Sequence, residues 1–296
     1  MVLRIEQTSV TPASCTLILA YPKEYGVCMT PSYRRIASLK SIDQFSEHLE
    51  SLGIAEQIPL SSGDITEPLS SPISLPNGHT IGNRFCVQPM EGWDGTSDGR
   101  PTELVTRRWR SFGRSGAKLI WGCEAVAVEH AGRANPNQLR MGEDTVEDLE
   151  QLRHMLVNEH ENRFGGSSDL LVGLQLTHSG RFCRPSDKNR LEPVIPIRHQ
   201  ILDRRFGISP NHPIVTDEEI ETIIERFVSS GVLAQQAGFQ FVDVKHCHGY
   251  LGHELLSAFT RPGPFGGSFE NRMRFCREIV EGIRTETPQL QIGLRL

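Results

Sequence analysis

The sequence contains no pair of cysteines with the spacing of a metal-binding or redox motif. Its seven cysteines lie far apart, at positions 15, 28, 86, 123, 183, 247 and 276. This spacing argues against a zinc ribbon or a cysteine-ligated iron–sulfur cluster within the chain. Scattered cysteines are typical of a protein whose thiols stay reduced, and we therefore expect a cytoplasmic location.

Long hydrophobic runs and blocks of one charge are also absent. Glu6 and Pro12 interrupt the apolar stretch near the N-terminus, so we expect no secretory signal. No window approaches the ~20 apolar residues that a membrane helix requires. The net charge is −5, and basic residues form nothing longer than pairs such as Arg107-Arg108. We expect neither a membrane nor a nucleic acid as a partner.

Residues 1–74 differ in composition from the rest of the chain. Ser, Thr and Pro are frequent there, and one segment, Ser41–Leu52, has its apolar residues at helical spacing. A Ser- and Pro-rich piece, Pro59–Pro76, has the composition of a linker. We expect residues 1–74 to form an N-terminal extension with a linker, and residues 75–296 to form the main domain.

From Asn83 onward, short apolar segments alternate with amphipathic ones. The expected strands are Arg84–Gln88, Ala117–Cys123, Leu170–Leu176, Phe239–Lys245 and Gln291–Leu296. The expected helices are Thr102–Ser115, Val146–Arg163, Asp217–Ala237 and Asn271–Thr285. A capping box formed by Thr216 and Glu219 begins the third helix. This alternation predicts a parallel sheet with helices outside it.

Polar residues gather where the expected strands end. They are Gln88, Glu91, Glu124, Gln175, His178, Lys245, His248 and Arg295. A (β/α)8 barrel of the TIM type predicts this distribution, because its active site is built from the loops that follow the strands. No GxGxxG follows the first strand, which argues against a dinucleotide-binding Rossmann domain. Only five strands are expected, whereas a whole barrel takes ~250 residues. We therefore expect a barrel truncated after about the fifth strand.

The segment VDVKHCHGYLGHE, Val242 to Glu254, carries the densest group of reactive side chains. Side chains alternate along a strand. If the two valines face the outer helices, Asp243 and Lys245 point into the barrel, with His248 and Tyr250 on the loop that follows. A cation, an imidazole and a phenol together can hydrogen-bond a carbonyl oxygen and deliver a proton. The alternative is a set of satisfied polar residues at a strand end.

Other interpretations of single residues stay open. His246, His248 and His253 include the HxH spacing of zinc ligands, so a metal-dependent barrel hydrolase is an alternative, although no carboxylate pattern completes the set. The Gln175 amide could bind the edge of a flat heterocycle, or it could bond neighbouring backbone in the core. Met90 could serve in packing alone.

Five segments occur in a characteristic order: NRFCVQPM, GRPTELVTRRW, LTHSGR, KHCHGYLGHELLS and FGGSFENRMRF. Together they resemble the Old Yellow Enzyme family of NAD(P)H:flavin oxidoreductases, which includes the 2,4-dienoyl-CoA reductases. The resemblance covers roughly Leu75 to Leu296. It implies FMN over the barrel mouth, NAD(P)H as the reductant, and hydride transfer through the flavin to a small-molecule acceptor, an activated alkene or related electrophile.

The resemblance also implies roles for cofactor-binding residues. Pro89 and Met90 would line the flavin from the first strand, and the region ending at Glu124 would approach it from the second. Gln175 matches the family glutamine that bonds the pyrimidine edge of the flavin. Arg295 matches the arginine near flavin N1, where a positive charge stabilises the anionic reduced ring.

For catalysis, Lys245 and His248 occupy the positions of the family's substrate-binding pair, and Tyr250 corresponds to its tyrosine proton donor. Lys245 stands where histidine is usual, and lysine is a flexible point charge without an acceptor. Glu91 stands where a small polar or thiol residue is common. An acid there could pair with Lys245 across the mouth, or disfavour reduced flavin. The loop Arg184–Pro213 would shape substrate access.

The expected truncation carries its own alternative. FMN phosphate normally binds near strands seven and eight of such barrels, so we expect this chain to lack most of that charge complementarity. Five strands leave two open edges, which favour association. A non-catalytic fragment or pseudo-enzyme, completed by a partner chain or by a second copy in a homo-oligomer, is therefore the second hypothesis.

Overall fold

The structure of the protein is a computed structural model that describes residues 34–58, 60 and 66–296. The chain divides into two compact units, Met1–Gly63 and Asp64–Leu296, and each is described by itself. The N-terminal stretch in which we expected no secretory signal lies outside the described residues, as does part of the expected linker. The boundary that we expect after residue 74 stays a prediction.

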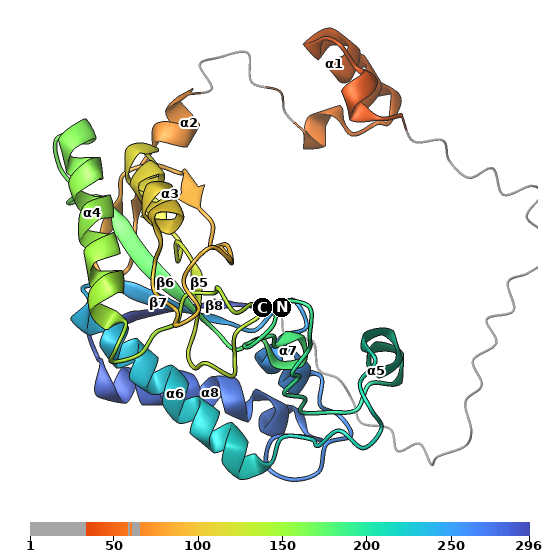
Figure 1. The fold of residues 1–296 in the computed structure, drawn as a ribbon. Coiled ribbons are helices and arrows are strands. Elements are labelled where there is room, and N and C mark those ends of the chain that lie inside the picture. Colours follow the sequence, from red (N-terminus) through yellow and green to blue (C-terminus); the bar gives the residue numbers. More distant parts are fainter. Residues whose placement is uncertain (1–33, 59, 61–65) are drawn as a thin grey trace, which may run out of the picture. The chain divides into compact units, whose positions relative to one another are not determined.

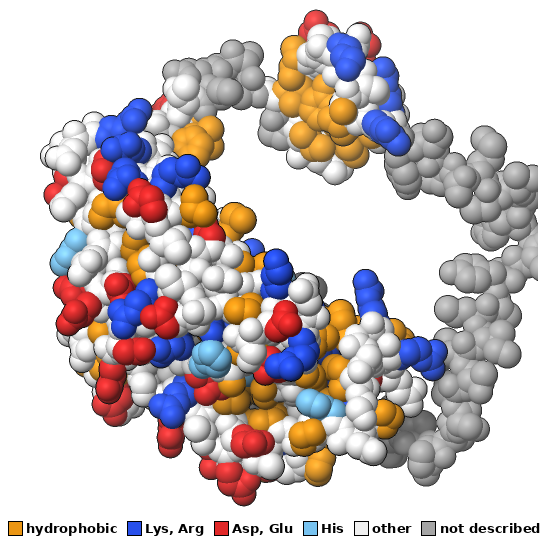
Figure 2. Space-filling model, viewed as in Figure 1, with side chains coloured by type: hydrophobic (Ala, Val, Ile, Leu, Met, Phe, Trp, Pro, Cys, Tyr) orange, Lys and Arg blue, Asp and Glu red, His pale blue; other side chains and the backbone are white. Residues whose placement is uncertain are grey.

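The first unit contains the helix α1, Ile42–Ser51, between the short 3₁₀ turns η1, Ile36–Ser38, and η2, Ala55–Gln57. Ser41 caps α1 by accepting a hydrogen bond from the Gln44 backbone N–H at 3.3 Å. The expected helix at Ser41–Leu52 is therefore confirmed. Hydrophobic side chains gather on one side of this unit (Figure 2); the exposed ones are Ile36, Ile42, Leu52, Ile58 and Leu60.

The second unit is built around a parallel sheet. Its strands are β3 (Cys86–Val87), β4 (Leu119–Ile120), β5 (Ala125–Ala127), β6 (Leu171–Thr177), β7 (Phe241–Lys245) and β8 (Gln291–Arg295). The strand order is β3-β4-β6-β7-β8, and β5 continues the path of β4 by pairing further along β6. All five expected strand positions are thus found, in the order of successive barrel strands.

Helices alternate with these strands and cover the outer side of the sheet (Figure 1). They are α3 (Glu103–Arg114), α4 (Val146–Phe164), α6 (Asp217–Gln236) and α8 (Phe269–Glu286). The four helices that we expected are confirmed, as is the capping box of Thr216 and Glu219 at the start of α6. Within the described ranges, no helix is long and apolar enough to cross a membrane.

Burial explains why these strands read as apolar runs. Every residue of β6 and of β7 is buried, because helices cover one face and the barrel interior covers the other. α3 packs against α4 and α6 against α8, and the contacts between them include the large buried side chains Trp109, Phe227 and Phe275. Charged side chains of both signs are interspersed over the outer surface (Figure 2).

Several elements were not expected from the sequence. Helix α2 (Thr66–Ser70) and strand β1 (Ile73–Ser74) lie within Pro59–Pro76, where we expected a linker, so that interpretation is wrong for these two elements. Strand β1 pairs antiparallel with β2 (Thr80–Ile81), which follows the expected linker. The reason is packing: Ile73 and Ile81 contact Leu171 and Phe241 at the N-terminal ends of β6 and β7. Burial of this small cluster fixes a pair of strands too short to show a period.

The second expected strand ends earlier than we predicted. After Ile120 the backbone takes positive φ values of 87° at Gly122 and 40° at Cys123. A Cβ on Gly122 would lie 2.8 Å from the Gln175 backbone nitrogen and 3.2 Å from the Pro89 Cβ, a close approach that only glycine permits. This irregularity separates β4 from β5 and brings the ends of three strands into contact.

Candidate active site

The polar residues at the strand ends share one rim, because the parallel register aligns them. Gln175 pairs with Asp243 across β6 and β7, and Lys245 pairs with Arg295 across β7 and β8. The Gln175 amide nitrogen donates to the Asp243 carboxylate at 2.5 Å, with both residues buried. Asp243 therefore points into the barrel, as the alternation of side chains predicts.

Lys245, Glu91 and Tyr250 form what we call the mouth cluster. The Lys245 ammonium lies 2.6 Å from Glu91 Oε1, and the Tyr250 hydroxyl donates to Glu91 Oε2 at 2.7 Å. The ammonium also lies 4.1 Å from the centre of the Tyr250 ring, within cation–π range. The side chains of Lys245 and Glu91 are 5% and 11% exposed. One carboxylate thus joins a cation and a phenol in a nearly dry setting.

The surroundings of the mouth cluster favour the protonated phenol. Burial, and then the negative charge of Glu91, raise the pKa of Tyr250 well above its ordinary value. The sequence suggested that Glu91 could pair with Lys245, and the structure contains this pair. The contact between Glu91 and Tyr250 was not predicted. The two residues are 159 positions apart, and no local pattern marks them.

His248 lies next to the mouth cluster in sequence but is exposed to solvent. Its backbone has a φ of 62°, a left-handed conformation uncommon outside glycine. Partial burial lowers its pKa, and the positive charges of Lys245 and Arg295 add to the effect. At neutral pH the imidazole is therefore mostly uncharged, and it can accept or donate one hydrogen bond.

The residues expected to bind a cofactor surround the mouth. Met90 is 64% exposed and Pro89 is half-buried, while the Arg295 guanidinium lies 3.5 Å from the Gln88 side-chain oxygen. Beside the Gln175 amide, the second oxygen of the buried Asp243 carboxylate has no hydrogen-bond partner among the described residues. Apolar groups at the rim, an amide and a cation, with an unsatisfied buried acceptor, fit a flat heterocycle with a polar edge.

Glu124, which we expected to approach the flavin, is bound on both carboxylate oxygens by other protein groups. Both ends of its carboxylate are engaged, by the Arg108 guanidinium and by the Gly92 backbone N–H at 2.8 Å. Arg108 also binds Asp94. Burial raises the pKa of Glu124, and the charge and hydrogen bonds of Arg108 only partly offset this. Its side chain thus ties the loop after β3 and helix α3 to the start of β5.

A second buried charge group, which we call the Arg181 cluster, lies between the turn η3 (Gly180–Phe182) and the helices α5 (Gln200–Phe206) and α7 (Leu251–Leu256). The Arg181 guanidinium binds Glu254 at 2.5 Å, Asp203, and the backbone oxygen of Ile197 at 3.0 Å. Burial raises the pKa of Glu254 to about 7 despite the Arg181 charge. Both helices were missed in the sequence, because each is under two turns long.

The three histidines considered as metal ligands do not converge. His246 is buried and lies against the Phe275 ring, with the ring centres 5.6 Å apart. The His253 ring nitrogen accepts from the Gly249 backbone N–H at 2.8 Å, and His248 is exposed. In the part of the chain that the structure describes, no three His, Cys, Asp or Glu side chains are placed to hold a metal. Geometry therefore gives the metal-dependent hydrolase no support.

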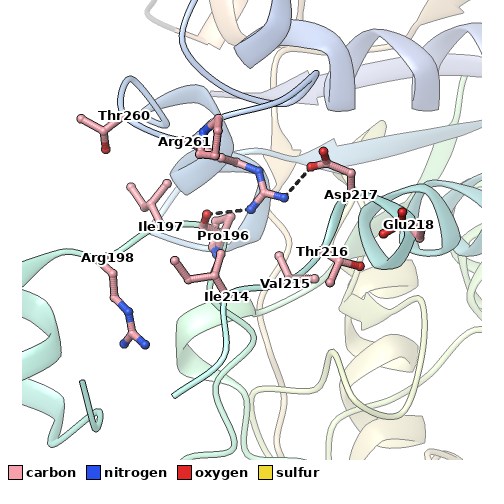
Figure 3. A pocket seen from close by; sticks show the side chains of 11 residues that line it. Pro196, Ile197, Arg198, Ile214, Val215, Thr216, Asp217, Glu218, Thr260 and Arg261 are labelled. Atoms are coloured by element: carbon pink, nitrogen blue, oxygen red, sulfur yellow. Dashed lines mark hydrogen bonds and ion pairs between the residues drawn. The ribbon is translucent and has the colours of Figure 1, made fainter. Parts of the chain in front are cut away.

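A cavity of about 530 Å³ lies away from the mouth, between residues 196–198, the start of α6 and residues 260–262 (Figure 3). Arg261 crosses it, binding the Pro196 backbone oxygen at 2.9 Å and Asp217 at 2.6 Å. None of the residues expected at the site lines this cavity. Both terminal nitrogens of Arg261 are engaged within the protein, so we regard the cavity as a gap between the loops.

A curved parallel sheet with outer helices and a polar rim defines a β/α-barrel protein with its site at the strand ends. The model of the NADH:flavin oxidoreductase / NADH oxidase family matches residues 68–296. The chain therefore belongs to this family, and the family expected from the sequence is confirmed.

Individual relatives agree with this assignment. An NADPH dehydrogenase from Geobacillus sp. (strain WCH70) is 31% identical over a match that covers 73% of this chain and 59% of the relative. An NADH:flavin oxidoreductase from Gibberella zeae is 28% identical over 74% of this chain and 54% of its own length. The chain thus spans about half the length of the curated relatives it matches.

Solved structures show the same fold. The Old Yellow Enzyme from Pichia sp. AKU4542 superposes with a TM-score of 0.62 at 22% identity, covering 77% of this chain and 59% of that one. The Old Yellow Enzyme homologue from Zymomonas mobilis gives a TM-score of 0.60 at 22% identity, covering 76% and 62%. The expected TIM-type barrel fold is thereby confirmed for the part that this chain contributes.

Proposed function

We propose that the chain carries the flavin-facing and substrate-facing part of an FMN-dependent NAD(P)H oxidoreductase that reduces an activated alkene or a related electrophile. The observation that carries the proposal is the mouth cluster beside the buried Gln175–Asp243 pair, at the strand ends of a chain of this family. Bound FMN supplies hydride chemistry, which no amino-acid side chain can perform.

Each proposed role follows from the chemistry of the side chain. Gln175 would bond the polar edge of the ring, Pro89 and Met90 would contact its face, and Arg295 would place a positive charge beside it. Glu124 would act indirectly, because its carboxylate is engaged by Arg108 and Gly92.

On the substrate side, Lys245 and His248 would hydrogen-bond the polar atom of the acceptor. The Tyr250 ring lies beside Lys245, with its centre 4.1 Å from the ammonium nitrogen. Low exposure of Lys245 strengthens such a bond, because little water competes with the acceptor.

Flavin binding by the purified chain tests the proposal directly. The protein is mixed with FMN and desalted, and the visible absorbance retained with it is measured. We expect wild type to retain flavin and Gln175→Leu to bind it about tenfold more weakly, the effect of losing a hydrogen bond worth about 1.4 kcal/mol. Gln236→Leu on the exposed surface of α6 is the matched control and should bind like wild type. A wild-type chain that retains no flavin contradicts the proposal.

Two further expectations concern the setting of the protein. The five cysteines within the described ranges are all free, which supports a reducing compartment such as the cytoplasm. We also propose a second copy of the chain as a macromolecular partner. Light scattering tests this: a monomer at all concentrations would contradict it.

A further inference from the structure

We propose that Glu91 is a positioning residue that turns the Tyr250 hydroxyl hydrogen away from the substrate and leaves Lys245 as the proton-bearing group that faces it. The inference rests on the proposed function for its consequence in catalysis, but its structural content can be tested on the protein without flavin. It reverses the roles that the resemblance implies, in which Tyr250 is the proton donor.

The argument begins with the number of hydrogens available. An ionised carboxylate only accepts hydrogen bonds, and a phenol has a single hydrogen to donate. Because the Tyr250 hydroxyl lies 2.7 Å from Glu91 Oε2, its hydrogen lies on the line to that oxygen. Toward any other group, the phenol then offers only lone pairs. A substrate that needs a donor cannot obtain one from Tyr250 while this bond holds.

Lys245 is in the opposite situation. An ammonium has three hydrogens, and the bond to Glu91 Oε1 at 2.6 Å uses one of them. The remaining two hydrogens are not used by the carboxylate, and the nitrogen lies 4.1 Å from the centre of the Tyr250 ring. Both groups lie at hydrogen-bond distance from Glu91. The lysine nevertheless keeps hydrogens that it can donate to a substrate, whereas the tyrosine has none left.

The groups around Tyr250 come from several elements, and they act in different directions. Glu91 approaches from the loop after β3, Lys245 from β7, and Cys183 from the segment after η3. Phe182 contacts the ring, with centres 5.9 Å apart. Burial and then the charge and hydrogen bond of Glu91 raise the pKa of Tyr250, and a hydrogen bond from Ser179 only partly offsets them. The phenol thus stays protonated and bound to Glu91.

Alkaline titration of tyrosine ultraviolet absorbance tests the clamp in the absence of flavin. The chain has four tyrosines, so the difference between wild type and Tyr250→Phe isolates the signal of Tyr250. We expect that signal to appear only at higher pH than that of an ordinary tyrosine. In Glu91→Gln it should move down by about one pH unit or more, because the negative charge that opposes ionisation is gone.

Two variants separate a positioning role from a merely structural one. Glu91→Asp keeps the negative charge, so most of the upward shift in the Tyr250 titration should remain. Asp94→Asn removes a charge from the same loop, but this charge binds Arg108, so the Tyr250 titration should stay as in wild type. A Glu91→Gln protein that is folded by circular dichroism and titrates like wild type overturns the inference. Should that variant not fold, ordinary titration of Tyr250 in wild type overturns it equally.

Rates measured with NADPH and a cyclic enone test the consequence for catalysis. We expect Lys245→Met to lose about a hundredfold in rate, the size of a general acid's contribution, and Tyr250→Phe to stay within about threefold of wild type. The opposite order, with Tyr250→Phe the slower variant, overturns the assignment. A wild-type chain that binds no flavin contradicts the proposed function alone, since the titrations still decide the role of Glu91.

Discussion

The mouth cluster and the Arg181 cluster are both built from a buried cation and carboxylate, yet they differ in how completely the cation is satisfied. The Arg181 guanidinium, which is fully buried, has three acceptors in Glu254, Asp203 and the Ile197 backbone oxygen. Lys245 has one carboxylate partner, Glu91, and an aromatic face. A planar fork with a partner on each of its three nitrogens holds segments together, whereas a point charge with a single carboxylate partner can still bind a ligand. The comparison separates a structural ion cluster from a chemical one.

The largest expected effect is on stability, from removing the cation of the Arg181 cluster. Arg181→Met leaves the buried Glu254 without its counter-ion and leaves Asp203 with only the more distant Arg198, at 3.7 Å. We expect the free energy of unfolding to fall by about 3–5 kcal/mol. Urea denaturation measures it. Arg190→Met is the control, because the Arg190–Glu192 pair is largely exposed and should contribute about 0–1 kcal/mol. Equal losses in the two variants would remove the distinction between the clusters.

The second prediction concerns pH and uses Glu254. Its pKa is raised by burial from 4.5 to about 7, so folding takes up a proton between those values. The free energy of unfolding therefore falls as the pH rises through that window, by an amount on the order of 2–3 kcal/mol. Glu254→Gln should abolish this slope in urea denaturation at a series of pH values.

His246 acts in the opposite direction and provides an internal check. Burial lowers its pKa from 6.5 to about 4, so its contribution to stability is lost as the pH falls through that range. In Glu254→Gln the loss from His246 is no longer offset, and the protein should weaken more steeply on acidification than wild type. A variant that keeps the wild-type pH profile would show that Glu254 has an ordinary pKa.

A smaller effect on stability is expected for the mouth cluster. Lys245→Met replaces the ammonium by an apolar group of similar length, and Glu91 keeps the hydrogen bond from the Tyr250 hydroxyl. We expect a loss of about 1–2 kcal/mol, measured by urea denaturation beside Arg181→Met. If Lys245→Met were the more destabilising of the two, the mouth cluster would be the structural one.

The smallest expected effect comes from Tyr250→Phe. The ring, its contact with Lys245 and its contact with Phe182 are kept, and the hydrogen bonds of the hydroxyl to Glu91 and Ser179 are lost. A loss of about 1 kcal/mol in the free energy of unfolding is expected, again from urea denaturation. A loss several times larger would mean that the hydroxyl helps to hold the site together beyond these two bonds.

The sequence predicted the long elements of the fold well. β6, β7 and β8 are long enough to appear as apolar runs, and the four outer helices have enough residues for the helical period to show. The shorter elements depend on contacts between distant segments. The β1–β2 pair exists because Ile73 and Ile81 are buried against β6 and β7, and β4 ends where Gly122 meets the backbone of Gln175. Neither contact leaves a local pattern.

In the site, too, the features that follow from local sequence could be predicted, and those that depend on contacts between distant residues could not. The strand-end rule and the family resemblance together locate Lys245, Gln175 and Arg295 at one rim, because register alone aligns them. The bond between Glu91 and Tyr250 and the Glu124–Arg108 pair depend on where side chains reach across the barrel mouth. These are properties of three-dimensional packing, and residue types alone do not determine them.

The ring contacts that join Phe206, Phe182 and Tyr250 bear on how this site could be redesigned. Phe182 lies between the other two, with ring centres 5.2 Å from Phe206 and 5.9 Å from Tyr250. A loop graft that exchanges α5 for a foreign segment would therefore also remove the outer support of Tyr250. An engineer who wants a new substrate range should keep an aromatic residue at position 206, or expect the phenol to move with the loop.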